Sequence, residues 1–177
     1  MYNYNNNLLY IIMRYVTYIL LIILVVIYFS PINFYDTNNE IINYFLRTFY
    51  HANLEHLLAN SISLYSLSFL EDLMGHKQFA LAIIFIWIVS SIILYIIHAL
   101  IPSRKVYTVG FSGVIFGLIV IYYMSLGQGV GITLTGLVVS ILPQLVIPGI
   151  SFEGHLSGII AGIIYIMLFP INKKIQN

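Results

Sequence analysis

Two residue types that cooperate in nucleophilic catalysis occur in glycine-rich surroundings in this chain. Ser112 stands in Gly-Phe-Ser-Gly (residues 110–113), and about forty residues later His155 stands in Gly-His-Leu-Ser-Gly (residues 154–158). A serine hydroxyl needs a nearby base before it attacks a carbonyl carbon, and imidazole often serves. Both residues open apolar runs, where polar side chains are costly and usually mark function. The pair therefore suggests a nucleophile and its base within a bilayer.

The glycines around both residues favour a close contact between two helices. Gly158 and Gly162 lie within about 60 degrees of His155 around a helix, so the imidazole shares a face with a groove that lacks side chains. A helix that carries Ser112 and Gly113 can approach this groove closely enough for the hydroxyl to reach the imidazole. Taken alone, Gly-x-Ser-Gly is better explained by helix packing, and a lone buried histidine by a structural role.

A third polar group lies in an earlier apolar run. His56 and Asn60 are spaced i, i+4 on one helical face, which Ser63 extends by a turn. This face must point to the interior of a helix bundle or to a water-filled cavity. Hydrogen bonding that only holds the bundle together is the alternative explanation. Ser112 falls at a helix start, where free N–H groups would stabilise a nearby oxyanion.

Composition indicates that these residues belong to an all-α integral membrane protein. Apolar residues make up 60% of the 177 residues and charged residues 7%, and the mean hydropathy is +0.97. We predict one domain over residues 1–177, with polar tails at 1–11 and 171–177. Six runs approach the roughly 20 residues that a membrane span needs. They cover about residues 12–32, 52–70, 79–101, 112–126, 130–148 and 154–170.

The remaining segments predict the topology and exclude several partners. The first run is too long for a cleavable signal peptide and has no basic leader. With six spans, four basic residues fall on one side and three on the other, and Lys173 and Lys174 favour cytoplasmic termini. Residues 30–50 suit a membrane-interface loop, or equally a surface loop with some buried aromatic residues. A net charge of +1 gives no reason to expect nucleic acid, and the absence of cysteine excludes disulfides and thiolate metal sites.

Taken together and in order, the motifs resemble those of the rhomboid family of intramembrane serine proteases. They are His51, His56 and Asn60 in the second run, residues 110–113 at the start of the fourth, and residues 154–162 in the sixth. The resemblance covers about residues 10–170. It implies a six-helix bundle that hydrolyses peptide bonds in or near the transmembrane segments of other membrane proteins, with a Ser-His dyad and no third acidic member.

The resemblance also implies a role for each residue. Ser112 would be the nucleophile and His155 the general base, while Asn60, His56 and the backbone N–H of Ser112 would form the oxyanion hole. Phe116 occupies the place where family members often stack a tyrosine on the histidine, and it lacks the hydroxyl. The supporting glycines would be Gly110, Gly113, Gly158 and Gly162.

Some features depart from the family pattern. The Trp-Arg pair that many members carry in the first loop reads Ile42-Asn43 here, and Arg47 is out of register, which concerns loop anchoring more than chemistry. Pro143 and Pro148 could weaken the fifth helix and open a path for substrate between the second and fifth helices, although ordinary helix termination explains them better. His76 and His98 suit the membrane interface without assigned chemistry.

The predicted partners are transmembrane protein substrates and membrane lipid, in a plasma membrane, with the site open to the outer side. No cofactor is expected. His51, Glu55 and His56 match none of the usual zinc spacings, so no metal is expected either. Two rival functions are an inactive rhomboid-like binding protein, which should lack Ser112 or His155, and a channel or small transporter, which would not need a serine flanked by glycines.

Overall fold

The computed structural model describes residues 14–31, 37–105, 108–145 and 151–170, and no strand occurs among them. The α-helices are α2 (Tyr15–Phe29), α3 (Glu40–Leu46), α4 (Leu54–Ser66), α5 (Phe69–Met74), α6 (His76–Leu100), α7 (Ser112–Ser125), α8 (Val130–Ile141) and α9 (Phe152–Leu168). Short 3-10 turns are η1 (Arg47–Phe49), η2 (Pro102–Arg104) and η3 (Leu142–Leu145). The predicted tails, Lys173, Lys174 and Pro148 lie outside the described residues.

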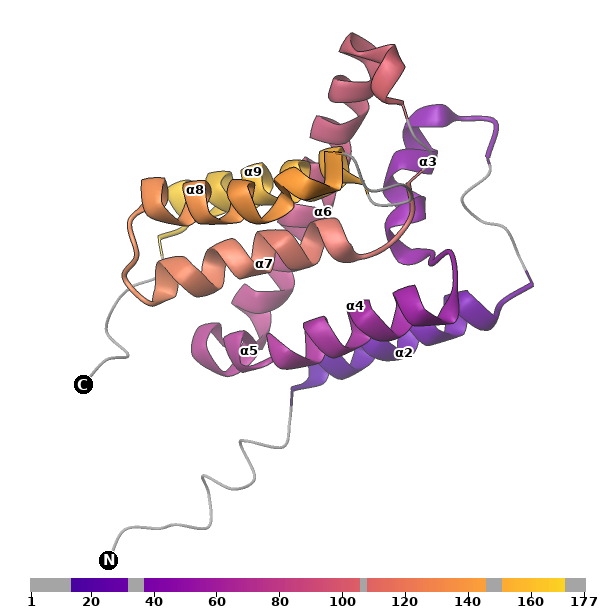
Figure 1. Ribbon diagram of the computed structural model, residues 1–177. Helices are drawn as coiled ribbons and strands as arrows, with labels where there is room; N and C mark the ends of the chain where they lie inside the picture. The colour runs from indigo at the N-terminus through magenta and orange to yellow at the C-terminus, as the bar shows by residue number, and fades with distance from the viewer. Residues whose placement is uncertain (1–13, 32–36, 106–107, 146–150, 171–177) are drawn as a thin grey trace, which may run out of the picture.

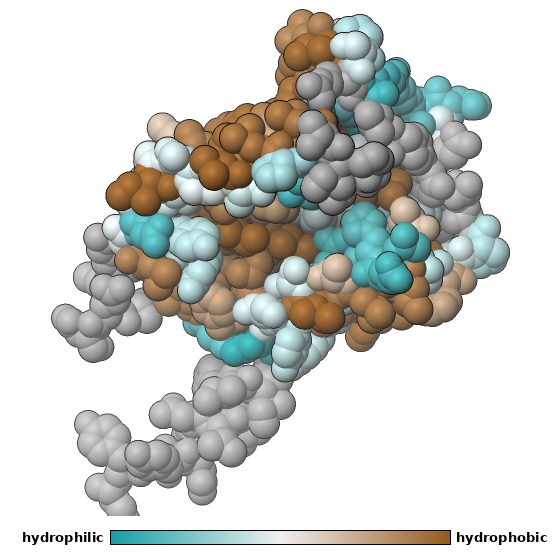
Figure 2. Space-filling view, in the orientation of Figure 1, coloured by the Kyte–Doolittle hydropathy of each residue, from teal (hydrophilic) through white to brown (hydrophobic). Residues whose placement is uncertain are grey.

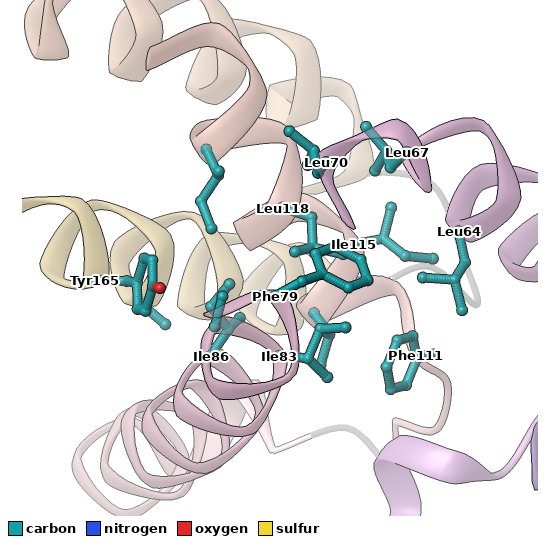
Figure 3. Packing of buried hydrophobic residues seen from close by; sticks show 14 of the residues in the cluster. Leu64, Leu67, Leu70, Phe79, Ile83, Ile86, Phe111, Ile115, Leu118 and Tyr165 are labelled. Atoms are coloured by element: carbon teal, nitrogen blue, oxygen red, sulfur yellow. The ribbon is translucent and has the colours of Figure 1, made fainter. Parts of the chain in front are cut away.

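The helices form two groups that α6 crosses. Figure 1 shows α7, α8 and α9 running side by side, and α2 and α4 running together beneath them. The main apolar core lies where α4, α5, α6, α7 and α9 meet, and Figure 3 shows Phe79, Ile86 and Leu118 packed there, each with no exposed surface. A smaller cluster joins α8 to α9 through Ile141 and Ile159.

The surface of the described chain is largely apolar. Figure 2 shows apolar side chains over α7 and α8, with a polar patch toward the end at which α4 begins. By length and composition, α6 alone among the described helices is long and apolar enough to cross a membrane. The helices α2, α7, α9 and the segment formed by α8 and η3 are apolar but shorter. All-helical structure is confirmed for the described residues, while six membrane spans stay a prediction.

Each of the six predicted runs contains a helix, but the fifth is shorter than expected. The sequence predicts a continuous span over residues 130–148, whereas α8 ends at Ile141 and continues as the 3-10 turn η3 to Leu145. Pro143 explains this change, because proline offers no N–H for a helical hydrogen bond to the carbonyl four residues before it. The structure therefore shows the helix termination that this proline predicts.

Glu71 of α5 fastens the first turn of α2 to the bundle. Its carboxylate has no exposed surface and accepts hydrogen bonds from the backbone N–H groups of Val16 and Thr17, both at 2.9 Å. His76 Nδ1 lies 2.6 Å from the same carboxylate. Burial by itself raises the pKa of Glu71, but these hydrogen bonds outweigh burial and lower it. His76, which the sequence left without a role, thus helps to hold α2 in place.

The segment before α4 is attached to α6 and to the turn before α7. Asn39 caps α3 by accepting from the N–H groups of Ile41 and Ile42, and the Tyr44 hydroxyl lies 2.8 Å from His98 Nδ1. His98 is 2% exposed because the Tyr44 ring covers it, and its predicted place at the membrane interface stays a prediction. Tyr44 is buried while Ile41 and Ile42 stay exposed, and both descriptions of residues 30–50, a membrane-interface loop and a surface loop, stay predictions.

The closest helix contact in the bundle is between α7 and α9. A Cβ added to Gly158 would lie 1.9 Å from the carbonyl oxygen of Gly113, and one added to Gly162 would lie 2.6 Å from that of Gly117. The two backbones can approach this closely only because glycine has a hydrogen atom where other residues have a side chain. The glycine groove predicted beside His155 is therefore filled by the backbone of the helix that starts with Ser112.

We predict that Gly158→Ala destabilises the protein, because its methyl group would collide with backbone rather than with a movable side chain. Overpacking of this kind costs about 1–3 kcal/mol, so thermal unfolding in detergent should begin at a lower temperature. Gly136→Ala in α8 is the matched control. Nothing lies within 4 Å of a Cβ there, so this variant should melt at or above the wild-type temperature. Equal melting of Gly158→Ala and the wild type would contradict the packing account.

Candidate active site

Ser112 is the first residue of α7, and a tight turn before it sets its position. Gly110 has φ +121°, a left-handed conformation that favours glycine, and its N–H donates to the carbonyl of Arg47 at 3.1 Å. A Cβ at Gly110 would lie 2.6 Å from Cε1 of His56. Glycine is thus required here both by the backbone and by the imidazole that lies against it. The turn brings the start of α7 next to α4.

His155 lies in the first turns of α9, behind a polar cap. The Ser151 hydroxyl accepts from the N–H of Gly154 at 2.9 Å, which starts the helix shortly before the histidine. The His155 side chain is turned inward, with only 9% of the residue exposed. The close contact of α9 with α7 at their glycines then brings the His155 ring to the start of α7.

The Ser112 hydroxyl and the His155 ring are at hydrogen-bond distance. Ser112 Oγ lies 2.8 Å from His155 Nε2. The other ring nitrogen, Nδ1, lies 2.6 Å from Oε1 of Gln144 in η3. An amide oxygen only accepts hydrogen bonds, so Nδ1 donates to it, and in the neutral ring Nε2 accepts from the serine hydroxyl. In this arrangement the imidazole can take the hydroxyl proton as the oxygen attacks a carbonyl carbon.

Sequence reasoning missed Gln144, although the chain carried a signal for it. Gln144 is a lone amide between apolar residues at the end of the fifth run, next to Pro143. A polar side chain at that depth calls for a partner. Its partner is His155, which lies eleven residues later and which no spacing rule connects to it.

Phe116 lies against the other face of the site, one turn after Ser112. Its ring stacks on that of His155, with centroids 4.4 Å apart and planes 29° from parallel. Phenylalanine therefore makes the stacking contact that the resemblance assigned to this position. The His155 ring is held by Phe116 on one face and by hydrogen-bonding groups at both nitrogens.

His56 and Asn60 approach the same region from α4. Asn53 caps this helix by accepting from the N–H of His56 at 2.8 Å, and Asn60 Nδ2 donates to the His56 carbonyl at 2.9 Å. That bond uses one of the two amide N–H groups of Asn60 and leaves the second for another acceptor. His51 packs edge-on against His56, and burial together with His56 lowers the pKa of His51 to about 4, so its ring is neutral near pH 7.

A cavity of about 500 Å³ joins these groups. Its polar lining includes Asn53, His56, Asn60, Ser112 and His155. Apolar residues of α7, among them Ile115 and Phe116, complete the wall. The sequence-predicted site residues thus converge on one space large enough for a short peptide segment. Within the described ranges, no group of three or more His, Asp or Glu side chains could hold a metal ion.

Comparison with known proteins gives a consistent family assignment. The family model described as Rhomboid domain matches residues 38–171. A protein of Acanthamoeba polyphaga mimivirus designated rhomboid protein L523 is 68% identical over 161 residues, which are 91% of this chain and 94% of that protein.

Two cellular relatives match a smaller part of their own length. Rhomboid-like protein 14, mitochondrial, of Arabidopsis thaliana is 35% identical over 140 residues, 70% of this chain and 42% of that protein. The uncharacterized protein Rv1337 of Mycobacterium tuberculosis is 32% identical over 138 residues, 70% of this chain and 58% of that protein.

We predict that the stacking of Phe116 on His155 affects the reactivity of Ser112. Aromatic pairs contribute about 0.5–1.5 kcal/mol, so Phe116→Leu should slow labelling of Ser112 by a fluorophosphonate about two- to tenfold. Phe116→Tyr keeps the ring and should label at the wild-type rate. The measurement is the labelling rate in detergent at fixed pH. Equal rates for the leucine and tyrosine variants would show that stacking does not orient the base.

Proposed function

The chain belongs to the rhomboid family of integral membrane proteins, and on that premise we propose that it is an intramembrane serine endopeptidase. Ser112 and His155 would form its catalytic dyad. The observation that carries the proposal is the 2.8 Å contact between Ser112 Oγ and His155 Nε2 in the wall of the cavity. Two helices packed glycine against glycine hold this contact, so the pair is preorganised for proton transfer.

The proposed reaction follows from the positions of these atoms. Ser112 Oγ attacks the carbonyl carbon of the scissile peptide while His155 Nε2 takes the hydroxyl proton. The imidazolium then gives this proton to the leaving amine, which leaves an acyl group on Ser112. A water molecule, deprotonated by His155 in the same way, hydrolyses the ester and frees Ser112 for another turnover.

The oxyanion of each tetrahedral intermediate would be bound between α4 and α7. The proposed donors are the second amide N–H of Asn60, the His56 ring and the backbone N–H of Ser112. The first N–H groups of a helix have no partner within that helix, and the helix dipole adds partial positive charge at this end. Both effects favour the negative oxygen over the neutral ground-state carbonyl.

The proposed substrates are transmembrane segments of other membrane proteins, which reach the site through lipid. An opening between α4 and α8 would serve as the path, since the cavity is lined on the α4 side and α8 ends at Ile141, shortly before Pro143. We place the chain in the plasma membrane, with six spans, cytoplasmic termini and a site open to the outer side. The positive charge beyond the last run supports this orientation.

The site geometry favours an enzyme over the two rival functions. A rhomboid-like binding protein would hold a transmembrane helix without needing a serine hydroxyl bonded to an imidazole. A channel would need polar groups along a path, whereas these polar groups line one cavity in which His155 contacts the Ser112 hydroxyl. Gln144 at Nδ1 and Ser112 at Nε2 hold the His155 ring in one orientation, as the role of a general base requires.

We predict that the purified protein cleaves a model single-span substrate in detergent and that Ser112→Ala or His155→Ala abolishes cleavage. Each variant removes one partner of the proposed dyad. Ser125→Ala is the matched control, because this serine of α7 donates to the nearby Tyr122 carbonyl and does not line the cavity. Cleavage by Ser112→Ala at the wild-type rate, measured on gels, would rule out Ser112 as the nucleophile.

We predict that Asn60→Ala lowers kcat by about 10²–10³ with little change in KM, as expected for a donor that acts in the transition state. Steady-state kinetics on the same substrate measure both constants. Thermal unfolding serves as the control, because Asn60 also bonds to the His56 carbonyl and its loss could weaken α4. A higher KM with unchanged kcat would instead assign Asn60 to substrate binding.

A further inference from the structure

The ring of His155 has a partner at the nitrogen that faces away from Ser112. Gln144 Oε1 lies 2.6 Å from His155 Nδ1, and Gln144 is partly buried in the turn that follows α8. We propose that Gln144 is a positioning residue of the protease reaction, whose side-chain carbonyl holds His155 in the tautomer and orientation that a general base requires. This inference rests on the proposed function.

The direction of the hydrogen bond determines which nitrogen of His155 is basic. A neutral imidazole carries one N–H and one free lone pair. With the Gln144 carbonyl at Nδ1, the proton stays on Nδ1 and the lone pair of Nε2 faces the Ser112 hydroxyl. The opposite tautomer would place an N–H against the hydroxyl and leave Nδ1 facing a carbonyl, so the ring could not accept the serine proton. Gln144 therefore selects the reactive tautomer.

An amide suits this position better than a carboxylate in an apolar bundle. In three-member triads a buried carboxylate orients the histidine and stabilises the imidazolium. At membrane depth an ionised carboxylate carries a large desolvation cost, which a neutral amide avoids. Gln144 supplies the orienting acceptor without a net charge. The ring partners found for His155 among the described residues are Ser112, Gln144 and Phe116.

The position of Gln144 depends on how α8 packs against α9. The α-helix ends at Ile141, and the 3-10 turn η3 then carries the amide to the start of α9. Ile141 has no exposed surface and packs in one cluster with Ile159 of α9. A displacement of α8 from α9 would pull Gln144 away from His155. The orientation of the base is thereby coupled to the packing of α8.

Two substitutions at Gln144 separate a positioning role from a packing role. Gln144→Met keeps the length of the side chain but removes the acceptor, and it should lower kcat about tenfold or more with little change in KM. Gln144→Glu keeps an acceptor and should restore kcat on the alkaline side of the pH profile. Its acid limb should move to higher pH, because the carboxylate stabilises protonated His155. The titratable groups near His155, which are His56 in the cavity wall, His51 packed against it and Glu153 in the first turn of α9, are unchanged in both variants.

A packing role would give the reverse result, with Gln144→Met close to wild type and the buried carboxylate of Gln144→Glu more damaging. Gln78→Met is the control for loss of a bonded glutamine elsewhere, because Gln78 donates to the Tyr165 hydroxyl at 2.7 Å, away from the cavity. It should leave the pH profile unchanged. Wild-type kcat and an unshifted profile in Gln144→Met would overturn the proposal.

A second measurement is independent of catalysis. In full-length protein with Ser112→Ala and isotope-labelled histidine, NMR should detect the His155 proton on Nδ1, and the added change Gln144→Met should weaken its protection from exchange. A proton on Nε2 instead would overturn the inference. If the wild type cleaves no substrate while the Nδ1 proton is seen, the proposed function fails and the contact with Gln144 still holds.

Discussion

The close approach of α7 and α9 is the contact on which the rest of the site depends. The Gly113 carbonyl occupies the space that a side chain at Gly158 would need, and Gly117 and Gly162 repeat the contact one turn further along. In lipid such packing depends on van der Waals contact at short range, which small residues allow. Because Ser112 and His155 project from the first turns of these two helices, the backbone contact sets the distance between their side chains.

The second constraint is the low polarity around the site, which makes every unpaired polar group expensive. The groups in contact with the His155 ring are neutral, and the buried carboxylate of Glu71 lies elsewhere, in α5. His155 is contacted by Ser112, Gln144 and Phe116, whereas the buried carboxylate of Glu71 collects its hydrogen bonds at the far ends of α2 and α6. The contacts that orient the His155 ring and those that anchor α2 thus involve different residues.

Much of the fold and of the candidate site could be predicted from the chain. The six apolar runs each hold a helix, and the i, i+4 spacing of His56 and Asn60 placed both in the wall of one cavity. In the fifth run the apolar composition continues past Pro143, whereas the α-helix ends at Ile141. The burial of His98 could not be predicted, since it depends on Tyr44, a residue 54 positions away in the sequence.

The sequence by itself determined which residues could do chemistry and which helix faces they occupy, because helical periodicity and glycine spacing are local properties. Only the tertiary structure decided what orients the base. The family resemblance named Phe116, but Gln144 reaches His155 through the end of α8, a 3-10 turn and the start of another helix. No periodic rule spans such a connection, so a hydrogen bond across it follows from the packing of α8 on α9.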